Sequence, residues 1–231
     1  MELYTVNITN KLFRVALLVL LLSPTSAWAA FVTTNESEMD AVFSQDSFGL
    51  NKIDIVFNST ITIQNSSLLN IDSEDKINQL FHGLNTGVTW PTVNLFFVDT
   101  ISYCSGYNTS IIGCASFPGN DIVVESAYAA GSKGAELLAH ELGHNLGLGH
   151  NVPELNLMHG TINENTDLTA AQVVTILGSG LVQNIPSDGD LYRIEITPIL
   201  IAAVPLPGAL VLLLSGLSFF GIASRRAQQR A

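Results

Sequence analysis

The sequence predicts an α+β fold, and three observations lead to this prediction. Several stretches have the apolar patterns of β-strands, and several others have apolar residues at helical spacing. Of the 231 residues, 47% are hydrophobic, which is too many for a largely disordered chain. The length allows one medium domain or two small ones.

Strand patterns occur between residues 50 and 125. Residues 93–98 (VNLFFV) form a continuous apolar run, which is typical of a strand that is buried on both faces. The last two strands are separated by Phe-Pro-Gly-Asn, a strong turn signal. The expected strands are residues 52–57, 60–63, 93–98, 110–116 and 121–125.

Three helices are expected. In the first, which follows Ser73, apolar residues recur at i, i+3, i+4 and i+7. The last follows Thr169, and Gln172 is placed to complete a capping box with it. The expected helices are residues 73–84, 133–146 and 169–177. Residues 30–50 have a mixed composition that predicts no element.

The N-terminal segment has the features of a secretory signal peptide. Lys11 and Arg14 precede an apolar run, residues 15–22, that is too short to cross a bilayer. Small residues then lie at the positions that signal peptidases require, with cleavage expected after Ala29. Residues 1–29 are therefore expected to be removed on export, and an N-terminal membrane anchor is the alternative.

The C-terminal segment combines the sequence VPLPG, an apolar stretch and a terminal arginine cluster. Counted from Ile199, the apolar stretch is long enough for a membrane helix, with Arg225 and Arg226 on the cytoplasmic side. Residues 183–203 are expected to be a polar spacer that leads to this tail, residues 204–231. A plain membrane anchor is one interpretation of the tail.

The same tail resembles the VPLPA type of PEP-CTERM sorting signals of Gram-negative bacteria, with Gly208 where alanine is usual. The resemblance implies export across the inner membrane and transient anchoring in the membrane. It also implies recognition by an exosortase-type membrane enzyme, removal of the tail, and delivery to the cell surface or the extracellular matrix.

The charge distribution separates the ends of the chain from its middle. The formal net charge is −11 and the mean hydropathy is +0.36. Residues 30–196 contain nineteen acidic and four basic residues, whereas the ends are basic and apolar. Nine Lys and Arg against twenty Asp and Glu exclude a nucleic-acid footprint. The charge predicts a soluble exported domain and weakly favours cationic substrates.

The two cysteines, Cys104 and Cys114, both lie in the part expected to be exported. An even pair in an oxidising compartment usually forms a disulfide, and two free thiols are the alternative.

Residues 140–150 (HELGHNLGLGH) contain the pattern of a metal site. His140 and His144 are four residues apart on an expected helix, so both imidazoles lie on one side and can bind one Zn²⁺. Glu141 can reach the same cavity. Gly147 allows a sharp turn that returns His150 as a third ligand. Three protein ligands leave one position open, which is typical of catalytic zinc.

This motif resembles that of the metzincin zinc endopeptidases, HExxHxxGxxH, at every fixed position. Met158 matches the methionine that this family has in a tight turn under the metal. The resemblance implies a catalytic domain over residues 30–182. It also implies a twisted mixed sheet of about five strands, with an active-site helix, a second packing helix and a C-terminal helix. An edge strand of that sheet would bind the substrate backbone through Ile112, Gly113, Cys114 and Ala115.

The predicted function is therefore that of an exported zinc endopeptidase that acts on a protein or peptide. A zinc-activated water attacks the peptide bond, and Glu141 is the expected general base. Two alternatives remain open: a catalytically inactive zinc-binding surface or matrix protein, and a zinc hydrolase acting on a non-protein amide. His159 is expected to be a site-wall or structural residue and not a fourth ligand.

Overall fold

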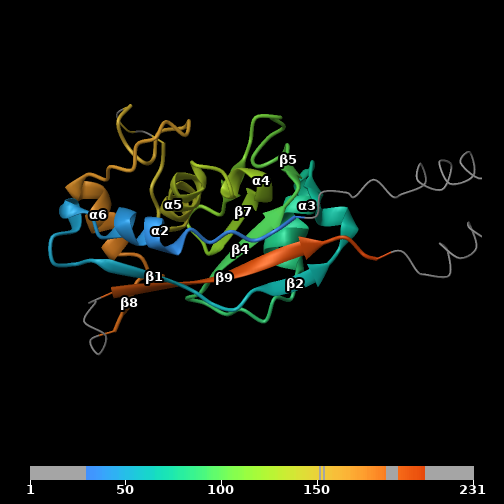
Figure 1. Ribbon diagram of the computed structural model, residues 1–231, viewed down its shortest axis with the longest axis horizontal. Coiled ribbons are helices and arrows are strands. Elements are labelled where there is room, and N and C mark those ends of the chain that lie inside the picture. The colour runs from blue at the N-terminus through green and yellow to red at the C-terminus, as the bar shows by residue number, and fades with distance from the viewer. Residues whose placement is uncertain (1–29, 151, 153, 186–191, 206–231) are drawn as a thin grey trace, which may run out of the picture.

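The computed structural model describes residues 30–150, 152, 154–185 and 192–205, which form a mixed β-sheet with helices on both faces (Figure 1). Four parallel strands are followed by one antiparallel edge strand. Their order is β1 (Ile53–Phe57), β9 (Tyr192–Ala202), β4 (Val93–Val98), β7 (Asp121–Glu125) and β6 (Gly113–Ala115). The prediction of helices combined with a mixed sheet is confirmed, although most strands of the sheet are parallel.

Two short strands complete this sheet. β2 (Ile61–Gln64) runs parallel to the second half of β9, and β8 (Gln183–Asn184) runs antiparallel to its start. The central strand β4 is buried along its whole length, as its continuous apolar run predicts.

One face of the sheet is covered by three helices that lie on the same side of it in Figure 1. They are α2 (Glu36–Phe43), α5 (Gly134–Asn145) and α6 (Ala170–Leu177). Their buried apolar residues pack with alternate residues of the strands, such as Leu95 and Phe97 of β4, in the larger hydrophobic core. The capping box of α6, in which Thr169 and Gln172 bond each other's backbone, is present as predicted.

A second core covers the other face. It contains Phe96 and Val98 of β4 and apolar residues of α3 (Glu74–Asn78), whose turn continues to Gly83 as a π-helix. A two-stranded sheet of β3 (Asn70–Ile71) and β5 (Thr100–Ile101) joins this layer. The short helix α4 (Ser126–Ala129) and the 3₁₀ turns η1 (Asp46–Phe48) and η2 (Ser66–Leu68) complete the described elements.

The predicted polar spacer over residues 183–203 is wrong for residues 192–202. These residues form β9, which lies inside the sheet between β1 and β4. Ile194 and Ile196 enter the larger core, and Ile199 and Ile201 enter the second core. The folded domain therefore extends beyond residue 182, and part of the apolar run counted from Ile199 belongs to the sheet.

Polar residues within β9 explain why the sequence did not indicate a central strand. Arg193 pairs with Asp54 of β1 at 3.2 Å, and the hydroxyl of Thr197 accepts a hydrogen bond from Asn58 at 3.2 Å. Pro198, which has no N–H to donate, also argues against a central strand. These groups are satisfied only once the strand has neighbours, which a local pattern does not reveal.

The predicted signal peptide, residues 1–29, lies outside the described residues, as does most of the predicted tail, residues 204–231. Within the part of the chain that the structure describes, no helix has the length and apolar character needed to span a bilayer.

Candidate metal centre

Helix α5 fixes the first two histidines because most of its residues are packed inside the protein. Leu137, Leu138 and Leu142 belong to the larger core, so the helix has little freedom to rotate. His140 and His144 lie one turn apart on it, with ring centroids 4.8 Å apart.

Three imidazoles converge at this point. The Nε2 atom of His150 lies 3.0 Å from Nε2 of His140 and 2.9 Å from Nε2 of His144. Among the described residues, they form the only cluster of three or more potential His, Cys, Asp or Glu ligands. The predicted convergence of these three histidines is confirmed.

The outer ring nitrogens show which tautomers are present. Nδ1 of His140 lies 2.7 Å from the carbonyl oxygen of Leu157, and Nδ1 of His144 lies 2.8 Å from that of Leu148. Because a carbonyl oxygen only accepts, each Nδ1 carries the hydrogen and each Nε2 presents a lone pair. A neutral imidazole has one N–H, so the ring of His150 can donate to at most one of these two Nε2 lone pairs.

A cation among these nitrogens would remove the repulsion between their lone pairs. Burial lowers the pKa of His140 to about 4, and it also lowers the pKa values of His144 and His150. The imidazoles are therefore neutral near pH 7, which is the form that binds metals. The three-histidine group could hold a metal ion.

The chain reverses directly after α5, and this brings His150 back to the helix. Gly147 has a φ of 94°, a left-handed conformation that glycine adopts without steric cost. Its N–H donates to the carbonyl of His144 at 3.0 Å, and the N–H of Leu148 donates to that of Gly143 at 2.9 Å. The predicted turn at Gly147 is confirmed.

Glu141 lies against the edge strand β6. It is only 5% exposed. A Cβ atom on Gly113 would overlap Oε1 of Glu141 and would come within 2.9 Å of its Cγ and Cδ, so glycine is needed for this approach. Burial raises the pKa of Glu141 to about 8, whereas a cation at the histidines would lower it.

Met158 packs against α5 at Gly143. It is fully buried, and a Cβ atom on Gly143 would overlap its Sδ. The N–H of Met158 donates to Asn156 at 2.9 Å, which fixes the turn that also presents the carbonyl of Leu157 to His140. Gly143 thus has a packing role that its position between the two histidines did not reveal.

The histidines and Glu141 line a cleft of about 1060 Å³. Its wall includes Ile112, Gly113, Cys114 and Ala115, the residues predicted to bind a substrate backbone. Among the described strands, β6 is the terminal one of the sheet and pairs only with β7.

The register of β6 leaves part of its backbone available. The N–H of Glu125 in β7 bonds the carbonyl of Ile112 at 3.0 Å. Because antiparallel pairs alternate, Gly113 and Ala115 direct their N–H and C=O groups away from β7. These groups could pair with an extended ligand.

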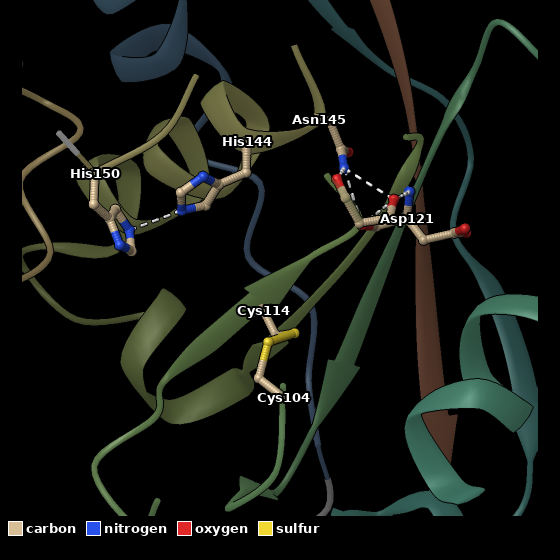
Figure 2. Close-up of a disulfide and its surroundings, with 7 residues drawn as sticks. Cys104, Cys114, Asp121, His144, Asn145 and His150 are labelled. Carbon is tan, nitrogen blue, oxygen red and sulfur yellow. Dashed lines mark hydrogen bonds between the residues drawn. A yellow bond between two sulfur atoms is a disulfide. The ribbon is translucent and has the colours of Figure 1, made fainter. Parts of the chain in front are cut away.

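A disulfide joins Cys104 and Cys114, as predicted (Figure 2). It connects the loop that precedes β6 to β6 itself. Residues 104–108 and 110 of this loop line the cleft, so the disulfide holds one rim of the cleft against the edge strand.

Asn145 connects the end of α5 to the turn between β6 and β7 (Figure 2). Its side-chain nitrogen donates to the carbonyl oxygens of Ser116 at 2.8 Å and Asp121 at 3.1 Å, and the residue is 1% exposed. A buried amide next to His144 therefore fixes the helix relative to β6. Only the polar character of Asn145 beside the motif could have indicated this role.

The cleft wall also contains aromatic and apolar residues that the sequence did not identify. Phe117 is 60% exposed and lies edge-on to His144, with ring centroids 6.1 Å apart. Further residues of this kind in the wall are Tyr107, Tyr128, Leu137 and Ile162.

His159 lines the cleft but does not belong to the three-histidine group. Its Nδ1 lies 3.2 Å from the carbonyl oxygen of Thr161, which also lines the cleft. No protein-family model, curated protein or solved structure matches this chain.

Proposed function

We propose that the protein is an exported zinc-dependent endopeptidase of the metzincin type. One observation carries this proposal. Three neutral imidazoles bring their Nε2 atoms to one point, beside a buried glutamate, in a cleft bordered by a strand edge.

The donor set fits zinc. Neutral imidazole is a preferred zinc ligand, and three protein ligands with an open position are typical of catalytic sites. Nitrogens bound at about 2.0–2.1 Å in a tetrahedral arrangement lie roughly 3.4 Å apart. The potential ligand atoms of the three histidines all lie within 4.8 Å of one another, which is close enough for one ion to contact all three. The carbonyls of Leu157 and Leu148 hold the other two rings in the binding orientation.

The free edge of β6 favours a polypeptide substrate. An extended peptide can add to this edge as a further strand, bonding the outward backbone groups of Gly113 and Ala115. Such bonds do not depend on substrate side chains. Because Glu141 lies directly against Gly113, a peptide bound there passes beside the carboxylate.

Glu141 is the proposed general base. When bound, zinc supplies Lewis-acid polarisation of a carbonyl group and activation of a water. Glu141 takes a proton from the attacking water and returns it to the leaving amine. Gly113 and Ala115 hold the peptide backbone in register, so that the same peptide bond stays beside the carboxylate.

The test is the variant Glu141→Gln, which keeps the shape of the side chain but removes its basicity. We expect zinc content, measured by mass spectrometry, to equal that of the wild type. Cleavage of a peptide library should fall by at least about 100-fold, the scale of general-base catalysis. Glu74→Gln, a change of an exposed residue on α3, is the matched control and should leave both unchanged.

Three outcomes would refute the proposal. Full activity of Glu141→Gln with bound zinc would remove Glu141 from the chemistry. A wild type that binds zinc but cleaves no peptide would favour an inactive zinc-binding protein. Cleavage of a non-protein amide alone would favour a zinc hydrolase that does not act on proteins.

Export and sorting are part of the same proposal and rest on the two ends of the sequence. The predicted sorting motif begins at Val204, two residues after the end of β9 at Ala202. We propose that an exosortase-type enzyme removes this tail and that the domain is released to the cell surface or matrix. A cut after β9 would leave the sheet complete.

A further inference from the structure

Glu136 is a buried carboxylate that the proposed chemistry does not use. It lies on α5, one helical turn before His140, and is 6% exposed. Its Oε1 accepts hydrogen bonds from the N–H groups of Asn163 at 2.8 Å and Glu164 at 3.0 Å. Its Oε2 lies 3.0 Å from the same N–H of Glu164. A buried carboxylate is costly unless it is hydrogen-bonded, and here backbone groups of a distant segment supply the bonds.

The segment held in this way, residues 159–165, connects the turn at Met158 to α6. Glu164 has a φ of 66°, a left-handed conformation that is unfavourable for a residue with a side chain. The bonds to Glu136 offset this local cost. On the far side, the side chain of Asn163 donates to the carbonyl of Glu154 at 2.6 Å, so the segment is fixed from two directions.

The same segment forms part of the cleft. Gly160, Thr161 and Ile162 line it, together with β6 and the histidines. Ile162 directly precedes the first amide that Glu136 holds. The position of this part of the wall relative to His140 is therefore set through one side chain of the same helix.

We propose that Glu136 is a positioning residue, which fixes residues 160–162 relative to the histidines and so sets the shape of the substrate cleft. Glu136 does not touch the substrate. Its effect on catalysis rests on the proposed peptidase function, whereas its effect on the segment does not.

The experiment compares the wild type with Glu136→Gln. The amide can keep its oxygen at the Oε1 position, but it then places an NH₂ group against the N–H of Glu164 and loses the negative charge that strengthens both backbone bonds. Hydrogen exchange of residues 159–165, followed by mass spectrometry, should become about tenfold faster or more, the scale of losing hydrogen bonds to a charged group. Exchange in α6 and in the core strands should not change. Glu154→Gln, an exposed change next to the same segment, is the matched control and should leave exchange unaltered.

Activity gives a second, independent readout. In Glu136→Gln we expect KM for a peptide substrate to rise several-fold, with kcat within about twofold and zinc content unchanged, because the wall moves while Glu141 and the ligands stay. A residue that only stabilised the fold would lower the melting temperature without moving KM. If Glu136→Gln does not fold, Glu136→Asp keeps the charge but is too short to reach both amides, and it should show the same two changes.

The outcomes separate the two proposals. If the wild type cleaves no peptide, the proposed function fails and hydrogen exchange alone decides the role of Glu136. Unchanged exchange in residues 159–165, or faster exchange throughout the protein, would overturn the positioning role. So would a fall in kcat with KM unchanged.

Discussion

Gly113→Ala tests whether the contact between the edge strand and Glu141 matters for catalysis. The new Cβ would lie 2.9 Å from both Cγ and Cδ of Glu141, whereas ordinary contact begins at 3.4 Å. It would also overlap Oε1. The carboxylate must therefore retreat by about half an ångström or more. Rotation of the carboxylate alone is not enough, because Cγ is also too close.

The expected effect falls on activity and not on folding. A misplacement of about 1 Å can cost about 100-fold in rate, so kcat/KM should fall by roughly 10- to 100-fold. The colliding atoms belong to the end of one side chain, so the free energy of unfolding should change by less than about 1 kcal/mol. Both are measurable on one preparation, by peptide cleavage and by urea denaturation.

Gly106→Ala is the matched control. Gly106 lines the same cleft, but no heavy atom lies within 4 Å of the position of its added Cβ. This variant should behave as the wild type. If Gly113→Ala kept kcat/KM within threefold of the wild type, the reasoning that places the reacting bond beside this contact would be refuted.

Three further predictions concern stability. Ile196→Ala in β9, at a position 1% exposed, should lower the free energy of unfolding by about 2–5 kcal/mol in urea denaturation, and a loss near zero would contradict the central position of β9. Replacing Cys104 and Cys114 together by serine should cost about 2–3 kcal/mol, and the same variant should no longer respond to dithiothreitol. Burial raises the pKa of Asp121 and outweighs the hydrogen bond from Asn94, which lowers it. The protonated Asp121 therefore contributes stability below the ordinary pKa near 3.8, and this contribution is lost as the pH rises through the raised pKa. When melting temperatures are measured against pH, Asp121→Asn should remove this loss of stability. A profile identical to that of the wild type would contradict the role of Asp121.

Local patterns were sufficient wherever the element is decided by its own residues. The run at 93–98 and the capping box at Thr169 and Gln172 gave β4 and the start of α6. The spacing of His140, Glu141 and His144 likewise fixes their relation on one helix, because four residues make about one turn.

Elements that depend on distant partners were not predictable. α2 (Glu36–Phe43) is short, and only Met39, Val42 and Phe43 are buried. Asn35, which precedes it, does not cap the helix but donates to the carbonyl of Ala129 at 2.9 Å. Met39, Val42 and Phe43 have the i, i+3, i+4 spacing of a helix, but this signal covers little more than one turn, and as with β9 other stabilising groups lie far away in the sequence.

The candidate site divides in the same way. The motif predicts the ligands and Glu141, since one turn of helix and one glycine turn bring them together. The residues that hold these elements in place, such as Glu136 and Asn145, bond backbone groups 27 and 29 positions away in sequence. Their side chains have no spacing relation to the motif, so a role in positioning becomes visible only once the partners are known.

The distribution of charge gives a different view of substrate preference from the net charge of −11. Among the described residues that line the cleft, Glu141 is the only acidic one, and no Lys or Arg is present. The wall instead offers aromatic and apolar side chains such as Phe117 and Ile162. Charges outside the cleft act through water and salt, which screen them over about 8–10 Å. Discrimination between substrate side chains at the reacting bond should therefore follow apolar contact and not charge.

We accordingly expect that raising the salt concentration changes KM little for a neutral peptide, and that lysine or arginine beside the scissile bond brings no gain in kcat/KM. A strong preference for cationic peptides that disappears in salt would show that the acidic surface, and not the cleft wall, selects the substrate.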